Sequence, residues 1–319
     1  MNDMLFVTLL ATGILYGTPL IFAGLGELLA ERGGVMNLGV EAIMLMGAFA
    51  GLWASESLDG PGWIVLTLAF VFAALVGAAM SAVYAFVVVT LRANQVVAGL
   101  AMLLLAGATG LSSYLASVGK LARVVGSNRL PKYDVFGLGD APVVGPLIFN
   151  HNILVYGSWG LVVLVSFYLN RTRLGLNLRA VGENPKSADA MGVNVALYRY
   201  AHTILGGAMA GIAGGYYTLA ITPYWVNNIT AGAGWIAIAL VITAFWRPGF
   251  LLVGAYLFGV LRGLGFTMQT HDIDLPPELF SALPFLLTIV AVVLVSSGLL
   301  RGRLHQPAAL GEPYAREDS

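Results

Sequence analysis

Long hydrophobic stretches dominate this chain, and polar residues collect in short intervals between them. A helix needs about 20 consecutive apolar residues to cross the hydrocarbon core of a bilayer. Backbone groups in lipid must find partners within their own segment, so each such run is predicted to be a helix. Several runs are short or interrupted by glycine, so we expect about eight to ten spans. The nine runs lie near 4–26, 36–54, 62–91, 95–117, 151–169, 200–221, 232–246, 249–269 and 278–299.

The composition agrees with a bundle embedded in a membrane. Hydrophobic residues make up 58% of the chain and charged residues 10%, whereas a soluble domain carries about 25% charged residues. The 40 glycines would let helices approach closely. We therefore expect an all-α, polytopic integral membrane helical bundle over residues 1–300. A polar tail over 301–319 is expected to be disordered.

Basic residues divide unequally between the two sides that alternating spans define. If the hydrophilic stretch 170–199 is cytoplasmic, eleven basic residues fall on that side and four on the other, as the positive-inside rule expects. The C-terminus is then cytoplasmic, and Arg262 lies within a span, where we expect it to pair inside the bundle. The cytoplasmic set is Arg32, Arg92, Arg171, Arg173, Arg179, Lys186, Arg199, Arg247, Arg301, Arg303 and Arg316; the extracytoplasmic set, in the loop 118–150, is Lys120, Arg123, Arg129 and Lys132.

The sequence lacks the motifs that are typical of several classes of function. No G-x-x-x-x-G-K-[ST] loop occurs, so the chain is not expected to hydrolyse ATP alone. The four histidines are scattered and there is no cysteine, so we expect no metal site, no cofactor and no catalytic residues. Lys plus Arg and Asp plus Glu both number 16, which gives no reason to expect a nucleic-acid partner.

The stretch 170–199 contains the start and stop signals of a short helix. Asn184 suits the N-cap position and Pro185 the first helical position. Gly192 suits the position after the last turn. These signals predict a helix of about two turns over 185–191, between two spans. Such a helix would suit the docking of a partner; a capped, solvated loop is the alternative.

A second polar segment interrupts the apolar pattern near the N-terminus. Gly33 and Gly34 can break a helix, and Asn37 and Glu41 share a helix face because they are four residues apart. Broken helices with polar ends recur at substrate sites within membranes, so Glu41 is a candidate substrate contact. A structural hydrogen bond between helices, or a place at the cytoplasmic edge, accounts for Glu41 equally well.

Amide and aromatic residues at the ends of spans are further candidates for lining a path. Asn94 and Gln95 open one span, where helix capping is the competing role. Trp235 opens another, where anchoring at the membrane interface competes.

Three motifs together resemble a known family. Arg179-Ala-Val-Gly-Glu-Asn-Pro, followed by Met191-Gly192-Val193, looks like the cytoplasmic signature of ABC-importer permeases for branched-chain amino acids, simple sugars and nucleosides. The segment from Glu27 to Glu41 is similar to the nucleoside-type permeases, which keep a glutamate at the positions of Glu31 and Glu41. Gly232-Ala-Gly-Trp235 with Trp246-Arg-Pro-Gly249 is the third match. The resemblance covers nearly the whole chain.

The resemblance implies a permease subunit of an ATP-driven importer in the inner (plasma) membrane of a prokaryote, surrounded by membrane lipid. It implies three protein partners: an ABC ATPase, a second homologous permease and an extracytoplasmic substrate-binding protein. Nucleosides are the expected substrates, ahead of simple sugars and branched-chain amino acids. Glu27, Glu31 and Arg32 are expected at the membrane interface, near the ATPase. The short helix would contact the ATPase through Glu183, Asn184, Pro185, Lys186, Ala188, Asp189 and Gly192.

A stand-alone secondary transporter or channel is the alternative from another class. The spans hold few carboxylates and no clear cluster for ion coupling, which disfavours it. A membrane enzyme would need a polar catalytic set at one interface, and the sequence shows none.

Overall fold

A computed structural model shows the chain as a bundle of helices. It describes residues 2–107, 109–121, 126, 128–269, 277–296 and 306–315, and these contain twelve α-helices and one two-stranded sheet. Arg123, Arg301, Arg303 and Arg316 lie outside the described residues. The helices are α1 (Asn2–Arg32), α2 (Val40–Ser57), α3 (Gly62–Ala85), α4 (Gln95–Ala106), α5 (Leu111–Val118), α6 (Ile153–Arg171), α7 (Arg173–Glu183), α8 (Pro185–Ala190), α9 (Val195–Tyr216), α10 (Ala233–Thr243), α11 (Pro248–Gln269) and α12 (Pro277–Ser296).

Each of the nine apolar runs is mainly helical in its described part, which confirms the all-α fold. Within the described residues, five helical segments are long and apolar enough to cross a membrane, and α10 and part of α11 are shorter apolar helices. Two π-helical turns lengthen α3 and α9, at Phe86–Thr90 and Tyr217–Ile221. The long segments are Phe6–Arg32, Gly62–Thr90, Gln95–Val118, Ile153–Arg171 and Val195–Ile221.

Two boundaries and one further helix differ from the sequence prediction. The run at 95–117 is two helices, because Gly107 leaves the helical conformation with a ψ of −163°. The first helix continues to Arg32 rather than ending near 26, because its late glutamates find partners inside the bundle. Helix α7 was not predicted from the sequence.

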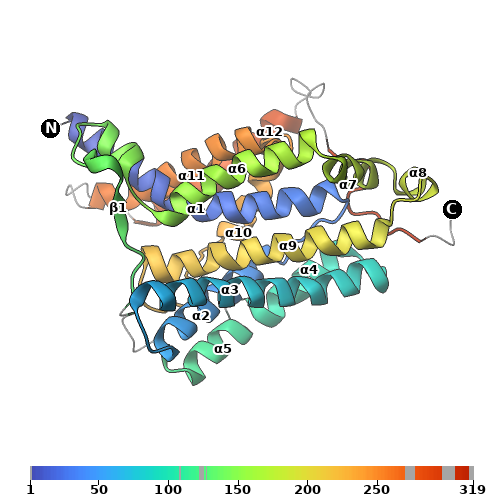
Figure 1. Ribbon diagram of the computed structural model, residues 1–319, viewed down its shortest axis with the longest axis horizontal. Helices are drawn as coiled ribbons and strands as arrows, with labels where there is room; N and C mark the ends of the chain where they lie inside the picture. Colours follow the sequence, from blue (N-terminus) through green and yellow to red (C-terminus); the bar gives the residue numbers. More distant parts are fainter. Residues whose placement is uncertain are drawn as a thin grey trace.

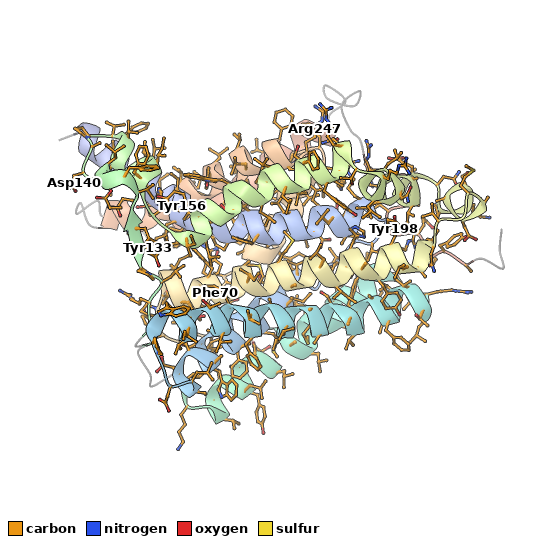
Figure 2. All side chains as sticks on the ribbon, viewed as in Figure 1. Phe70, Tyr133, Asp140, Tyr156, Tyr198 and Arg247 are labelled. Atoms are coloured by element: carbon orange, nitrogen blue, oxygen red, sulfur yellow. The ribbon has the colours of Figure 1, made fainter. Side chains whose placement is uncertain are left out.

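Different elements lie at the two ends of the bundle. Helices α7 and α8 lie at one end with the C-terminal residues 306–315, and β1 (Lys132–Asp134) lies at the other end near the start of α1 (Figure 1). Arg247 and Tyr198 lie toward the α7 end, while Tyr133 and Asp140 lie at the far end (Figure 2). We call these the α8 end and the β1 end.

Close packing of glycines holds the centre of the bundle. Helix α9 packs against α1, α2 and α3, and α1 packs also against α11. At the α1–α9 crossing, a Cβ on Gly26 would lie 2.6 Å from the carbonyl oxygen of Gly206. Residues larger than glycine would therefore force these two helices apart.

The loop 118–150 contains little regular helix in its described part. Strand β1 pairs antiparallel with β2 (Asn150–Asn152), with Tyr133 opposite His151. Short 3-10 and π turns at Val135–Gly137 and Gly145–Phe149 lie between the strands. The hairpin ties this loop to the first residues of α6.

The expectation of a disordered tail is wrong for residues 306–315. These residues, which we call the tail strap, lie against the α8 end of the bundle, and Ala309 and Ala315 are buried. The polar sequence of the strap suggested solvation, but its backbone finds partners on the bundle.

Candidate functional site

The structure contains the predicted short helix, α8, with its predicted caps. The Asn184 side-chain oxygen accepts a hydrogen bond from the Ser187 amide at 3.0 Å, and Pro185 occupies the first turn. Gly192 follows the helix with a φ of +84°, a conformation in which glycine avoids the strain of a side chain. The helix therefore has a fixed beginning and end.

One face of α8 is buried against the bundle and the other is exposed. Ala188 is buried against Val181 and Val195, which fixes the helix to α7 and α9. Lys186 is exposed, and Met191 just after the helix is 84% exposed. Of the other predicted contact residues, Glu183, Asn184 and Gly192 are exposed, whereas Pro185 and Asp189 are half-buried.

The tail strap joins α8 to the rest of the same end. The Ala309 amide donates to the Gly182 carbonyl at 2.9 Å, and the Gly311 amide donates to the Gly34 carbonyl at 3.2 Å. The buried Arg199 guanidinium donates to the Glu312 carbonyl at 2.9 Å. The Tyr314 hydroxyl donates to the Asp189 carboxylate at 3.1 Å. The strap therefore connects the end of α7, the segment after α1, the start of α9 and α8 itself.

The chain between α1 and α2 is a buried segment without helix, residues 33–39. Its peptide groups are satisfied by side chains: Gln95 accepts from the Met36 amide at 2.8 Å, and Glu27 accepts from the Asn37 amide at 2.7 Å. The Tyr84 hydroxyl donates to the Met36 carbonyl at 2.5 Å. Such satisfaction is what allows irregular backbone inside a membrane protein.

Asn37 and Gln95 therefore come together in one buried cluster. Gln95 also donates to the Gly34 carbonyl at 3.4 Å, and the Asn37 side chain accepts from the Gly39 amide at 2.9 Å. Both side chains are 3% exposed. Asn94 is exposed and caps α4 by accepting from the Val96 and Val97 amides. In this conformation the side-chain amides of Asn37, Asn94 and Gln95 form hydrogen bonds with backbone groups.

Glu41 lies in the first turn of α2 and points at the N-terminus of α10. One carboxylate oxygen accepts from the Thr230 hydroxyl at 2.6 Å and the Gly232 amide at 2.9 Å. The other accepts from the Gly234 amide at 2.6 Å. The carboxylate is 4% exposed. Helix N-termini carry partial positive charge, so a single carboxylate stabilises the starts of both α2 and α10.

Arg262 extends this polar cluster from α11. Its guanidinium donates to the Tyr217 hydroxyl at 2.7 Å and to the Thr230 carbonyl at 2.6 Å. Thr230 thus joins Arg262 to Glu41. The partners of Arg262 could not be named from the sequence, and Thr230 was missed; its place two residues before the Gly232 motif was the available signal. Trp235, half-buried, lies beside Gly234 in the first turn of α10.

Glu27 and Glu31 are buried inside the bundle, whereas the sequence prediction placed them where they could help to bind the ATPase. They are 3% and 1% exposed. Glu27 accepts from the Asn37 amide, and Glu31 accepts from the Trp246 indole at 2.5 Å. Glu27 connects α1 to the segment 33–39, and Glu31 connects it to Trp246 in the loop before α11. Because both carboxylates are buried, they are not available to a partner. Arg32 is half-buried and donates to the Trp246 carbonyl at 3.0 Å.

Interrupted helices with polar ends recur in membrane transport proteins, and the α1–α2 interruption, joined to the start of α10 through Glu41, fits that pattern. Consistently, the family described as branched-chain amino acid transport system / permease component matches residues 9–292. The chain belongs to this family. It is an integral membrane permease of the ABC-transporter type, and its role is that of a transport subunit.

Several relatives match almost end to end. A protein provisionally named as a glucose ABC transporter permease of Haloferax volcanii is 38% identical over 94% of this chain and 95% of its own length. A nucleoside ABC transporter permease of Lactococcus lactis is 33% identical over 97% and 96%. A guanosine ABC transporter permease of Bacillus subtilis is 32% identical over 95% of each chain. No solved structure gives a significant match.

Proposed function

We propose that this chain forms part of the membrane path of an importer that takes up nucleosides, driven by a separate ATPase. The observation that carries the proposal is α8, a capped helix whose exposed face projects from one end of a polytopic bundle. A partner that moves α8 would act on α7 and α9 through buried Ala188, and on the segment 33–39 through the tail strap.

Two substrate classes have support from the relatives. Nucleoside and guanosine permeases are 33% and 32% identical to this chain, which favours nucleosides. Simple sugars are the second candidate, because the glucose-named relative is 38% identical. Both substrate classes carry a hydroxylated ring that amide and carboxylate side chains can recognise.

The path is expected to open near Glu41. Glu41, Asn37 and Gln95 are buried, and their polar atoms bond within the chain in this conformation. Separation of the α2 and α10 N-termini would expose these groups, with Trp235 beside them, to a substrate. A conformational change supplied by the partner would thus convert structural hydrogen bonds into substrate contacts.

Three partners complete the proposed importer. An ABC ATPase would dock on α8 in the cytoplasm, which places the C-terminus there too. A second permease would pack beside this chain in the membrane. A substrate-binding protein would deliver its cargo at the β1 end, where the loop 118–150 lies.

Cysteine crosslinking tests the docking of the ATPase. The chain contains no cysteine, so Met191→Cys and Ser187→Cys give one thiol each on the exposed side of α8. Both should crosslink to a cysteine series in the ATPase groove in an assembled importer. Ala188→Cys is the matched control, because its side chain is buried and should not react. If neither exposed position reacts, α8 is not the docking element.

Uptake by the reconstituted importer tests the substrate. Radiolabelled guanosine should accumulate only with the ATPase and ATP, and unlabelled nucleosides should compete while glucose does not. ATP-dependent accumulation of radiolabelled glucose, with none of guanosine, would select the sugar candidate. Uptake by the purified chain alone, without ATP, would instead show a stand-alone transporter.

A further inference from the structure

A groove runs between the outer faces of α6 and α11 toward the α8 end of the bundle. It consists of two adjoining hollows that share Ser166, Asn170 and Gly249. The larger hollow has a volume of about 1130 Å³ and reaches α7 and the end of α1. We call the combined feature the arginine groove.

The end of the arginine groove nearest α7 is strongly basic. Arg32, Arg179 and Arg247 line the larger hollow, and Arg171 lines the smaller one. Among the described lining residues, Glu183 supplies the single carboxylate. The Nε of Arg179 is buried and makes no hydrogen bond within the described part of the chain. The groove therefore has a surplus of positive charge and a donor in need of an acceptor.

The remainder of the arginine groove is apolar and open. Phe250 and Val253 on α11 are 54% and 66% exposed, and Phe167 and Val163 on α6 are 58% and 68% exposed. Leu176 on α7 is also exposed within the larger hollow. These side chains lie on apolar helices, where the hydrocarbon of the membrane would reach them. A water-soluble domain could contact the arginines but not this wall.

We propose that the arginine groove binds an anionic phospholipid of the leaflet at the α8 end. Arginines recognise phosphate through paired, charge-assisted hydrogen bonds, and basic pockets between membrane helices suit anionic head groups. The head group would lie among Arg179, Arg247 and Arg32, and an acyl chain would follow Phe250 and Val253. The lipid would then link the end of α1, α7 and the start of α11, on the side of the bundle next to α8.

Gly249 gives a variant that blocks the groove without disturbing the fold. It lies in both hollows, and a Cβ placed on it meets no heavy atom within 4 Å. Gly249→Leu should therefore fill the groove with its side chain while the helix forms normally. Gly157→Leu on α6 is the matched control: Gly157 is likewise open, but it lies near the opposite end of its helix.

Native mass spectrometry of the purified full-length chain, titrated with phosphatidylglycerol or phosphatidylcholine, tests the proposal. The wild type should bind phosphatidylglycerol more tightly than phosphatidylcholine. Arg247→Gln should weaken phosphatidylglycerol binding about tenfold, the effect of one charge-assisted contact. Gly249→Leu should weaken it by at least as much, because its side chain occupies the groove. Gly157→Leu and Arg92→Gln, whose arginine lines a separate hollow, should bind as the wild type does.

Three results would overturn the proposal. Equal binding of the two lipids would show that charge is not recognised. Unchanged phosphatidylglycerol binding in Gly249→Leu, with its folding verified by gel filtration, would place the lipid elsewhere. Displacement of phosphatidylglycerol by millimolar inorganic phosphate would indicate a site for a free anion. If phosphatidylglycerol stays bound in millimolar inorganic phosphate, the result supports a membrane lipid as the ligand.

Discussion

Glu41 illustrates how one side chain can hold two half-helices. Its carboxylate accepts three hydrogen bonds from the segment 230–234 while it occupies the first turn of α2. An acidic group at a helix N-terminus stabilises it by about 0.3–2 kcal/mol, most in buried settings. Opening a path through this region would therefore cost the free energy of these hydrogen bonds. A partner that hydrolyses ATP could supply that free energy.

Glu41→Gln should lower the thermal stability of the purified chain. An amide cannot accept at both ends, so either the Gly232 or the Gly234 amide loses its acceptor. The loss of a charged, buried acceptor should reduce the free energy of unfolding by about 1.5–3 kcal/mol. Intrinsic tryptophan fluorescence during heating measures it. Asp59→Asn, in an exposed loop, is the control and should leave the melting temperature unchanged. A Glu41→Gln protein that melts like the wild type but binds substrate more weakly would favour direct substrate contact.

Gly234→Ala should disturb the same junction by crowding. A Cβ at position 234 would lie 2.5 Å from the Glu41 amide nitrogen and 2.6 Å from its Cα. Overpacking of this kind lowers the free energy of unfolding by about 1–3 kcal/mol, measurable by the same melting experiment. Gly157→Ala, where an added Cβ meets nothing, should have no such effect. Equal melting temperatures would show that α10 can move away from α2 at little cost.

At the residue scale, the sequence predicted types of interaction better than partners. The sequence identified Glu41 as a candidate for either a structural hydrogen bond or a substrate contact. The residues that it contacts lie about 190 positions away in the chain. Such long-range pairing has no local signal. The burial of Glu31 was missed for the same reason, since Trp246 is contributed by a distant loop. The partner of Glu27 is only ten residues away, but it is a backbone amide, which carries no sequence signal.

At the scale of elements, α8 depends on its caps because six residues supply little helical stability of their own. Asn184→Ala should remove the N-cap bond and destabilise α8 locally by about 1 kcal/mol. Hydrogen exchange of the 186–190 amides should then accelerate about fivefold, while exchange in α9 stays unchanged. Ser187→Ala is the control, because only the backbone of Ser187 takes part in the cap. Exchange that is equally slow in both variants would show that packing of Ala188 alone holds the helix.

The sequence predicted where most of the helices lie, but it did not predict every break within them. The caps at Asn184 and Gly192 are local, so α8 was predicted almost to the residue. The run at 95–117 reads as continuous because apolar composition does not report on the backbone of Gly107. Helix α7 was missed because it lies in the most charged stretch of the chain, which resembles a solvated loop; two of its leucines, Leu174 and Leu176, are exposed.

At the scale of the whole molecule, the tail strap is the main departure from expectation. Deleting residues 306–319 should remove its four hydrogen bonds to the bundle and lower the free energy of unfolding by about 2–4 kcal/mol. Hydrogen exchange should rise in the segment 33–39, which the strap contacts through the Gly34 carbonyl. Deleting only 316–319 is the control. If both deletions melt at the wild-type temperature, the strap contributes nothing to the bundle.

The strap also sets an order of events during synthesis. Arg199 is translated 113 residues before Glu312, whose carbonyl its guanidinium contacts. At about 5–20 residues per second, that interval is about 6–23 s. Through this time the arginine at the start of α9 must stay hydrated, and the α8 end of the nascent protein stays unfinished. A partner that recognises α8 together with the strap would bind only chains whose translation has passed residue 315.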